Sequence, residues 1–296
     1  MYLRRRARFA YLLILPSLAV ITLLDLYPVV EGVIVSLQRQ NQMRADQEGF
    51  VGLAHYARAL GDDPLFWASL LKTIVWTGGA VAGGYVVALC LALLLDHDLR
   101  ARNVFRALFL LPWVIPDVCT ALLWKWLYGD EFGVFNVVLR RAGLIDEPIQ
   151  FLASPDMAMV SVIAVQIWKL YPVMFIVLLA ALQGVPRELH EAATIDGANS
   201  LQRFRHITIP HIRATSVIIC LLASIWTFQS FDLVYLLTGG GPSDATRILA
   251  TLIYQKAFWG LEMGYASALG LLMLVCLLAI SLAYLFVYRT QQETAA

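Results

Sequence analysis

The sequence predicts an all-α integral membrane protein, and three observations support that prediction. Of its 296 residues, 60% are hydrophobic and 15% are charged, and the mean hydropathy is +0.71, whereas a soluble domain carries about 25% charged residues. The sequence lacks the period-two alternation of a membrane β-barrel. Six apolar runs are each long enough to cross a bilayer as a helix: 9–37, 70–95, 105–128, 157–182, 213–236 and 264–288.

The first run is predicted to remain as a membrane helix. Four arginines between positions 4 and 8 precede it, as in a secretory signal, but the run is too long for a signal core and lacks a small-residue cleavage site near its end. Arginine and lysine are more frequent in one alternating set of segments, namely 1–8, 96–106, 183–213 and 289–296. The positive-inside rule therefore places both termini in the cytoplasm.

The chain carries no pattern typical of an enzyme, a metal site or a nucleotide site. His190 and Glu191 begin the H-E-x-x-H pattern of zinc proteases, but Thr194 stands where the second histidine belongs. The glycines at 239–241 continue into Pro242 without the lysine of a phosphate-binding loop. We therefore predict no catalytic residue, no metal and no cofactor in this chain. No nucleic-acid partner is expected either, because no basic block occurs beyond the N-terminus.

The segment between the fourth and fifth runs predicts a short helix that another surface can approach closely. Pro186 favours the first turn of a helix, where its missing N–H has no consequence. Ala192 and Ala193 are strong helix formers with small side chains. Asp196-Gly197 then ends the helix, because glycine readily adopts the left-handed conformation found at helix ends.

A second short helix is predicted after this glycine. Asn199 can cap it with Gln202 at the return position of a capping box, and Pro210 is expected to end it. Its apolar residues share one side: Leu201, Phe204 and Ile207. Two capped helices with an exposed phenylalanine exceed what a solvated link between two spans requires. We therefore interpret the segment as a docking surface on the cytoplasmic face.

This segment resembles the EAA loop of binding-protein-dependent ABC importer permeases. The matching residues are Glu191-Ala192-Ala193, Gly197 and Ile207-Thr208-Ile209-Pro210, with Ile209 where leucine is usual. Other stretches are similar to the carbohydrate-uptake branch of that family, the maltose-transporter-like permeases: Tyr27-Pro28, Ser36-Leu37, Phe50-Val51-Gly52-Leu53, Tyr56, Leu110-Leu111-Pro112, Ala181-Leu182-Gln183 with Pro186, and Gly240-Gly241-Pro242.

The resemblance implies a type I ABC importer permease fold in the bacterial inner membrane. It implies an N-terminal helix with the first outer loop (1–69), a five-helix permease core (70–288) that includes the coupling loop 184–212, and a cytoplasmic tail (289–296). The implied partners are a second related permease, two copies of an ATPase that bind ATP and magnesium, and an extracytoplasmic substrate-binding protein. The expected ATPase contacts are Glu191, Ala192, Ala193, Asp196, Gly197, Phe204, Ile207 and Pro210.

Polar side chains inside the apolar runs are the expected lining of a solute pathway, since such groups are costly in lipid. They are Asp117, Gln166, Lys169, Trp226, Thr227, Gln229, Ser230 and Asp232. Helical spacing predicts that Trp226, Gln229 and Ser230 share a face with Leu233. In the family resembled, sugar-binding positions correspond to several of these residues, but Val173 and Ala223 depart from its aromatic and hydroxyl residues.

Each of these polar residues also has a structural interpretation. Trp226 could pack, Thr227 and Ser230 could bond their own backbone, Lys169 and Asp232 could form ion pairs, and Asp117 could stabilise a kink. An ion-coupled secondary carrier would use the charged residues as coupling groups, although no inverted repeat is evident. The substrate stays open: disaccharides such as trehalose or maltose fit the resemblance best, and oligosaccharides, polyols and glycerol phosphodiester-like solutes are alternatives. The identity of the ATPase, the presence of a substrate site in this chain, and the choice between a hetero- and a homodimer of permeases also stay open.

Overall fold

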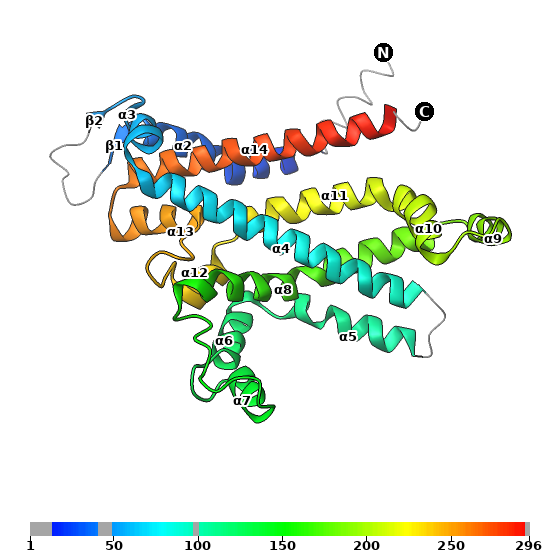
Figure 1. The fold of residues 1–296 in the computed structure, drawn as a ribbon. Helices are drawn as coiled ribbons and strands as arrows, with labels where there is room; N and C mark the ends of the chain where they lie inside the picture. The colour runs from blue at the N-terminus through cyan, green and yellow to red at the C-terminus, as the bar shows by residue number, and fades with distance from the viewer. Residues whose placement is uncertain (1–13, 41–48, 97–100, 294–296) are drawn as a thin grey trace, which may run out of the picture. The chain divides into compact units, whose positions relative to one another are not determined.

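The computed structural model describes residues 14–40, 49–96 and 101–293, and the chain is mainly helical there (Figure 1). The arginine cluster at 4–8 and the end of the tail at 294–296 lie outside the described residues. In chain order the helices and π-helical turns (η) are η1 Thr22–Leu26, α2 Tyr27–Ser36, α3 Ala54–Ala57, η3 Arg58–Asp62, α4 Pro64–Asp96, α5 Arg102–Val114, α6 Asp117–Leu127, α7 Val134–Arg141, α8 Pro155–Gln183, α9 Arg187–Ile195, α10 Ser200–Arg203, η4 Phe204–Thr208, α11 Ile209–Phe228, α12 Asp232–Thr238, α13 Leu249–Tyr254, η5 Gln255–Trp259 and α14 Met263–Glu293.

The predicted all-α membrane fold is confirmed in the described residues. Five helical segments are long and apolar enough to cross a membrane, and the pair α5–α6 adds a sixth if the two form one span. The five are Ile14–Ser36, Pro64–Asp96, Pro155–Gln183, Ser200–Phe228 and Met263–Phe286. The chain divides into two compact units: Met1–Trp67 with Leu252–Val275, and Ala68–Thr251 with Cys276–Ala296.

The third apolar run is broken, whereas the sequence predicted one span over 105–128. The axes of α5 and α6 meet at 97°, and α6 turns away from α5 in Figure 1. Ile115 has an extended backbone, as expected for a residue that precedes proline. Pro116, which follows it, is the N-cap of α6. The break therefore follows from the proline, which favours an extended conformation in the residue before it.

In the second unit, helices α4, α8 and α11 share a buried core, and we refer to them as the three-helix bundle. The core residues come from all three helices: Val81, Ala88, Ala92 and Leu95; Leu170, Met174, Phe175, Leu178, Leu179 and Leu182; Ile212, Ile219 and Ala223. Glycine permits close packing at one crossing, because a Cβ at Gly83 would clash with the side chain of Ile167. Without a hydrophobic force between helices in lipid, close packing of this kind holds spans together.

In the first unit, the stretches around Ser36-Leu37 and Val51-Gly52, which resemble the family's N-terminal signature, contact each other. The hydroxyls of Ser36 and Tyr56 lie 2.7 Å apart, and the N–H groups of Val51 and Gly52 donate to the carbonyl of Leu37. Strands β1 (Gln38–Arg39) and β2 (Gly49–Phe50) pair antiparallel beside this contact. The signature residues of the two stretches therefore fasten the end of α2 to the loop that follows it.

Candidate coupling site and polar residues of the spans

Helix α9 presents nearly all of its surface to its surroundings. It begins at Arg187, after Pro186 as N-cap, and none of its nine residues is buried. Ile195, at its end, is 87% exposed, and Leu201, just beyond it, is 72% exposed. A large apolar side chain as exposed as that of Ile195, outside the candidate membrane spans, is typical of a surface that binds another protein.

A glycine ends α9 in the way that the sequence predicted. Gly197 has a φ of +81°, its N–H donates to the carbonyl of Thr194 at 3.1 Å, and the N–H of Ala198 donates to the carbonyl of Ala193 at 2.9 Å. This pair of bonds is the Schellman arrangement, which satisfies the last carbonyls of a helix. The left-handed conformation favours glycine, because other L-residues are strained there.

The predicted capping box of the second helix is also confirmed. The backbone N–H of Gln202 donates to Asn199 Oδ1 at 2.9 Å, and the backbone N–H of Asn199 donates to Gln202 Oε1 at 2.8 Å. We call residues 187–203, which comprise α9, the glycine turn and α10, the coupling corner.

Arg203 joins the two helices of the coupling corner, α9 and α10. Its guanidinium donates to Thr194 Oγ1 at 2.5 Å and to Ser200 Oγ at 3.3 Å, while the Thr194 hydroxyl donates to the His190 carbonyl at 2.7 Å. Thr194 therefore serves as a link between the helices at the position where a zinc protease has its histidine. The sequence analysis missed Arg203, since no local pattern connects it to a residue nine positions earlier.

The expectation that Pro210 ends the second helix is wrong. Helix α10 continues through η4 into α11, so that Ser200–Phe228 forms one long helical segment. Pro210 lies in the first turn of α11. The preceding π-helical turn shifts the hydrogen-bond register before the proline, so that its ring and missing N–H are accommodated without a break. The coupling corner is consequently continuous with a membrane span.

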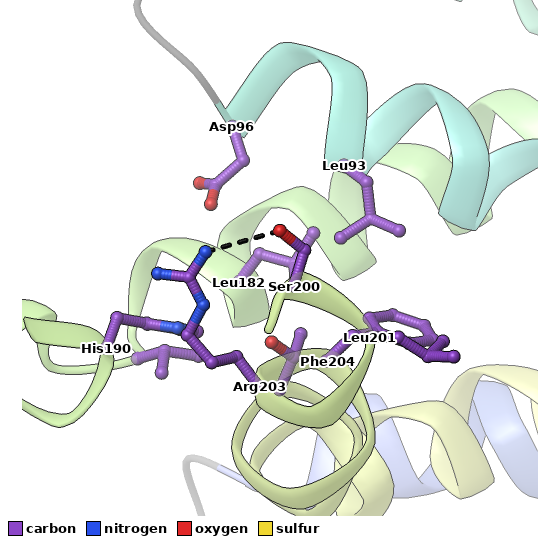
Figure 2. A pocket seen from close by; sticks show the side chains of 10 residues that line it. Leu93, Asp96, Leu182, His190, Ser200, Leu201, Arg203 and Phe204 are labelled. Carbon is purple, nitrogen blue, oxygen red and sulfur yellow. Dashed lines mark hydrogen bonds between the residues drawn. The ribbon is translucent and has the colours of Figure 1, made fainter. Parts of the chain in front are cut away.

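A cavity of about 570 Å³ separates the coupling corner from the ends of α4 and α8. Figure 2 shows Asp96, His190 and Arg203 around it, with Arg203 bonded to Ser200. Its apolar lining consists of Leu93 of α4, Leu182 of α8, Val185 in the link to α9, Leu201 of α10 and Phe204 of η4. The predicted contact residue Phe204 thus faces the chain's own helices, on the inner side of the coupling corner.

The remaining predicted contact residues lie on or beside the outer surface of the coupling corner. Glu191, Ala192, Asp196, Gly197 and Pro210 are exposed, and Ala193 and Ile207 are half-buried. Ala193, Gly197 and Ile207 line a shallow second cavity of about 350 Å³. The surface therefore combines small residues, two carboxylates and a recess, which suits insertion of a partner's side chain.

Within the bundle, two of the predicted pathway residues bind each other. Gln166 Nε2 lies 3.4 Å from Thr227 Oγ1, and both residues are buried. The backbone carbonyl of Thr227 accepts from the indole N–H of Trp76 at 3.1 Å. This network joins α8, α11 and α4. Gln166 and Thr227 therefore hold the bundle together in this conformation, and Trp76 is a partner that the sequence analysis missed.

Two of the predicted charged residues form an ion pair at the α5–α6 break. Lys169 Nζ lies 3.1 Å from Asp117 Oδ1, and it also donates to the backbone carbonyl of Ile115. The Lys169 side chain is 15% exposed and that of Asp117 44%. The lysine of α8 thus supplies a donor to the backbone where the helix is interrupted, which supports the kink interpretation of Asp117.

The other predicted pathway residues surround the end of α11. Trp226 is 47% exposed, Gln229 and Asp232 are exposed, and Ser230 is half-buried. Helix α11 ends at Phe228, and the new helix α12 begins at Asp232. The expected common face with Leu233 is therefore wrong, because that spacing assumed an uninterrupted helix. Leu233 is buried instead.

Comparison with known proteins places the chain in a family. The binding-protein-dependent transport system inner membrane component family matches residues 80–292. The chain belongs to this family. The permease is therefore a multi-pass protein of the inner membrane, and its family is one of transport proteins rather than enzymes.

Full-length relatives agree with this assignment. The permease is 34% identical over 289 residues to the trehalose/maltose transport system permease protein MalF of Thermococcus litoralis, covering 98% of this chain and 96% of that protein. It is 34% identical over 282 residues to the sulfoquinovosyl glycerol transport system permease protein SmoG of Agrobacterium fabrum, covering 95% and 91%.

A solved structure shares the type I importer permease fold. A chain of a bacterial ABC transporter involved in the import of the acidic polysaccharide alginate matches with a TM-score of 0.82 at 23% identity, over 97% of this chain and 96% of that one. The same fold occurs in the bacterial alginate ABC transporter in complex with an alginate pentasaccharide-bound periplasmic protein, with a TM-score of 0.79 at 24% identity, over 95% and 93%.

Proposed function

We propose that the permease is the membrane subunit of an ATP-driven sugar importer and that its coupling corner receives motion from a separate ATPase. The observation that carries this proposal is the form of the corner. Helix α9 buries none of its residues, yet the corner is cross-linked by Arg203 and continues into α11. An exposed element that is stiffly attached to a span is suited to transmit a partner's displacement.

The assembly that we propose contains a second, related permease, two copies of an ATPase and an extracytoplasmic substrate-binding protein. ATP and magnesium would bind to the ATPase. Its closing on ATP would carry the docked corners with it, and the free energy for moving the spans would come from the difference in affinity between the two states. The alginate transporter bound to a loaded periplasmic protein supports the binding-protein part of this proposal.

The proposed substrate is a disaccharide, such as trehalose or maltose, or an oligosaccharide. Support comes from relatives named for trehalose/maltose and sulfoquinovosyl glycerol transport. The end of α11 offers an exposed indole at Trp226, an amide at Gln229 and a carboxylate at Asp232, the groups that stack on and hydrogen-bond to sugars. The ion-coupled carrier is not favoured, because Asp117 and Lys169 bind each other and the family depends on binding proteins.

Docking is tested by substituting one small residue on α9. We expect Ala192→Trp, at an exposed position, to prevent close approach of the ATPase, so that a tagged permease no longer co-purifies the ATPase subunit and cells lose sugar uptake. The matched control is Ala142→Trp, an exposed alanine at the end of α7, which should retain the ATPase. If Ala192→Trp co-purifies the ATPase and supports uptake as wild type does, α9 is not part of the interface. Uptake that persists without any ATPase subunit would refute the proposal of an ATP-driven importer.

A further inference from the structure

Two arginines at the start of α5 converge on the last residue of α8. Arg102 and Arg106 are one helical turn apart, and each places a terminal guanidinium nitrogen beside the carboxamide of Gln183, at 2.5 and 2.7 Å from its oxygen when that oxygen faces them. Both arginines are half-buried. The side-chain Nε atoms of both are shielded from solvent and have no hydrogen-bond partner among the described residues.

This pair lacks a counter-charge within the part of the chain that the structure describes. The ion pairs there are Arg58–Glu262, Lys169–Asp117 and Arg247–Asp244, and none involves Arg102 or Arg106. Helix dipoles do not supply the missing negative charge, because the positive end of α5 and the negative end of α8 meet at this point and roughly cancel. Two half-buried guanidinium groups share one neutral acceptor, and such an arrangement favours an anion with several oxygen atoms.

The surroundings of the pair indicate which anion fits. An exposed apolar strip runs along α5 from the arginines toward the middle of the span, formed by Val104, Leu108 and Leu111 at positions spaced by four and three residues. The arginines lie at the same end of the second unit as the coupling corner, since Gln183 is separated from α9 by three residues. A phosphate at the arginines would thus sit at the membrane boundary, with apolar chains beside the strip.

We propose that Arg102, Arg106 and Gln183 form a binding site for an anionic phospholipid in the leaflet on the side of the coupling corner. The two guanidinium groups bind the phosphodiester oxygens, for which their planar donors are suited, and the acyl chains lie on the strip of α5. A zwitterionic lipid is disfavoured, because its ammonium group would approach two cations. The site is independent of sugar transport and of the ATPase contact proposed above.

The test uses the purified full-length permease and counts bound lipids by native mass spectrometry. Delipidated protein in nonionic detergent is titrated with phosphatidylglycerol and phosphatidylcholine of identical dioleoyl chains. We expect wild type to retain phosphatidylglycerol preferentially, and Arg102→Gln/Arg106→Gln to bind it about twenty-five-fold more weakly, at about a factor of five for each basic group lost. The matched control, Arg187→Gln/Arg205→Gln, removes two exposed arginines and should bind as wild type does.

Further measurements distinguish a lipid phosphate from free phosphate, and a loss of lipid binding from a loss of folding. Arg102→Lys/Arg106→Lys keeps the charge and should bind with intermediate affinity, while an unchanged thermal unfolding midpoint shows that each variant folds. Short-chain dihexanoyl phosphatidylglycerol should bind more weakly than the dioleoyl form, and inorganic phosphate should not displace the lipid. The proposal is overturned if the double glutamine variant keeps the lipid preference, if the control loses it equally, or if inorganic phosphate competes as well as lipid does.

Discussion

The coupling corner and the three-helix bundle are held together by different forces. Helix α8 buries twelve of its residues, whereas the adjacent α9 buries none. The corner owes its shape to short-range hydrogen bonds: a Schellman turn, a capping box and the bridge from Arg203. The bundle owes its shape to side-chain packing between distant segments.

This difference predicts two kinds of mutational result. Substitutions in the bundle should lower the free energy of unfolding first, and uptake should fall with the amount of folded protein. Substitutions in the corner should leave the amount of protein unchanged and act on uptake alone. The predictions below test this division, ordered by the expected change in the free energy of unfolding.

The largest effect is expected for Phe175→Ala in the bundle. Phe175 is fully buried and its ring meets that of Phe109 edge to face at 5.7 Å, so truncation leaves a cavity and costs about 3 kcal/mol. Ile176→Ala is the matched control, because Ile176 is 45% exposed. Denaturation of the purified protein measures both. Equal losses for the two variants would contradict packing as the force that holds the bundle.

A smaller effect is expected where α4 crosses α8. A valine at Gly83 would bring its Cβ to 2.9 Å from Ile167 Cγ1, so overpacking should destabilise by about 1–3 kcal/mol. Gly78→Val provides the comparison, since no atom lies within 4 Å of a Cβ at that position. The same denaturation experiment checks the pair. A Gly83→Val protein as stable as Gly78→Val would show that the crossing is looser than the structure indicates.

The ion pair at the α5–α6 break should contribute less. Lys169→Met removes the donor to both Asp117 and the Ile115 carbonyl, at a cost of about 1 kcal/mol once screening at the partly exposed Asp117 is allowed for. Asp117→Asn in the same chain should recover part of this loss. A double-mutant cycle measures the coupling. Strictly additive single effects would show that the two charges act independently.

Sequence reasoning succeeded where structure depends on neighbours along the chain. The capping box at Asn199 and Gln202 and the turn at Gly197 were predictable, because each pattern spans only a few residues. The apolar runs were predictable because the bilayer fixes their length. Those features set the positions of the spans and the shape of the corner.

Reasoning from spacing failed where a distant contact or a change of helical register decides the outcome. Pro210 lies inside a continuous helical segment, because the π-helical turn before it changes the register. Leu233 is separated from Trp226 by a break that no glycine or proline marks. The pairing of Lys169 with Asp117 joins residues of different helices, so spacing along one helix gives no sign of it.

The smallest change in stability is expected at the glycine of the coupling corner. Gly197 has a φ of +81°, and no atom lies within 4 Å of a Cβ built on it. Gly197→Val should therefore strain only the turn, at a local cost of about 1–2 kcal/mol. Because that strain stays within the corner, the angle between α9 and α10 should shift while the measured free energy of unfolding and the unfolding midpoint of the bundle stay unchanged. Uptake should be lost, since the corner no longer fits its partner.

The Gly197→Asn variant distinguishes an effect of the corner's backbone conformation on uptake from an effect of side-chain size. Asparagine tolerates the left-handed conformation better than other non-glycine residues, so the turn should persist and uptake should remain close to wild type. Uptake by both variants is compared at equal amounts of membrane-inserted protein. Loss of uptake in both variants would mean that the partner packs directly against Gly197. A lowered unfolding midpoint for Gly197→Val would show that the corner and the bundle unfold as one cooperative unit.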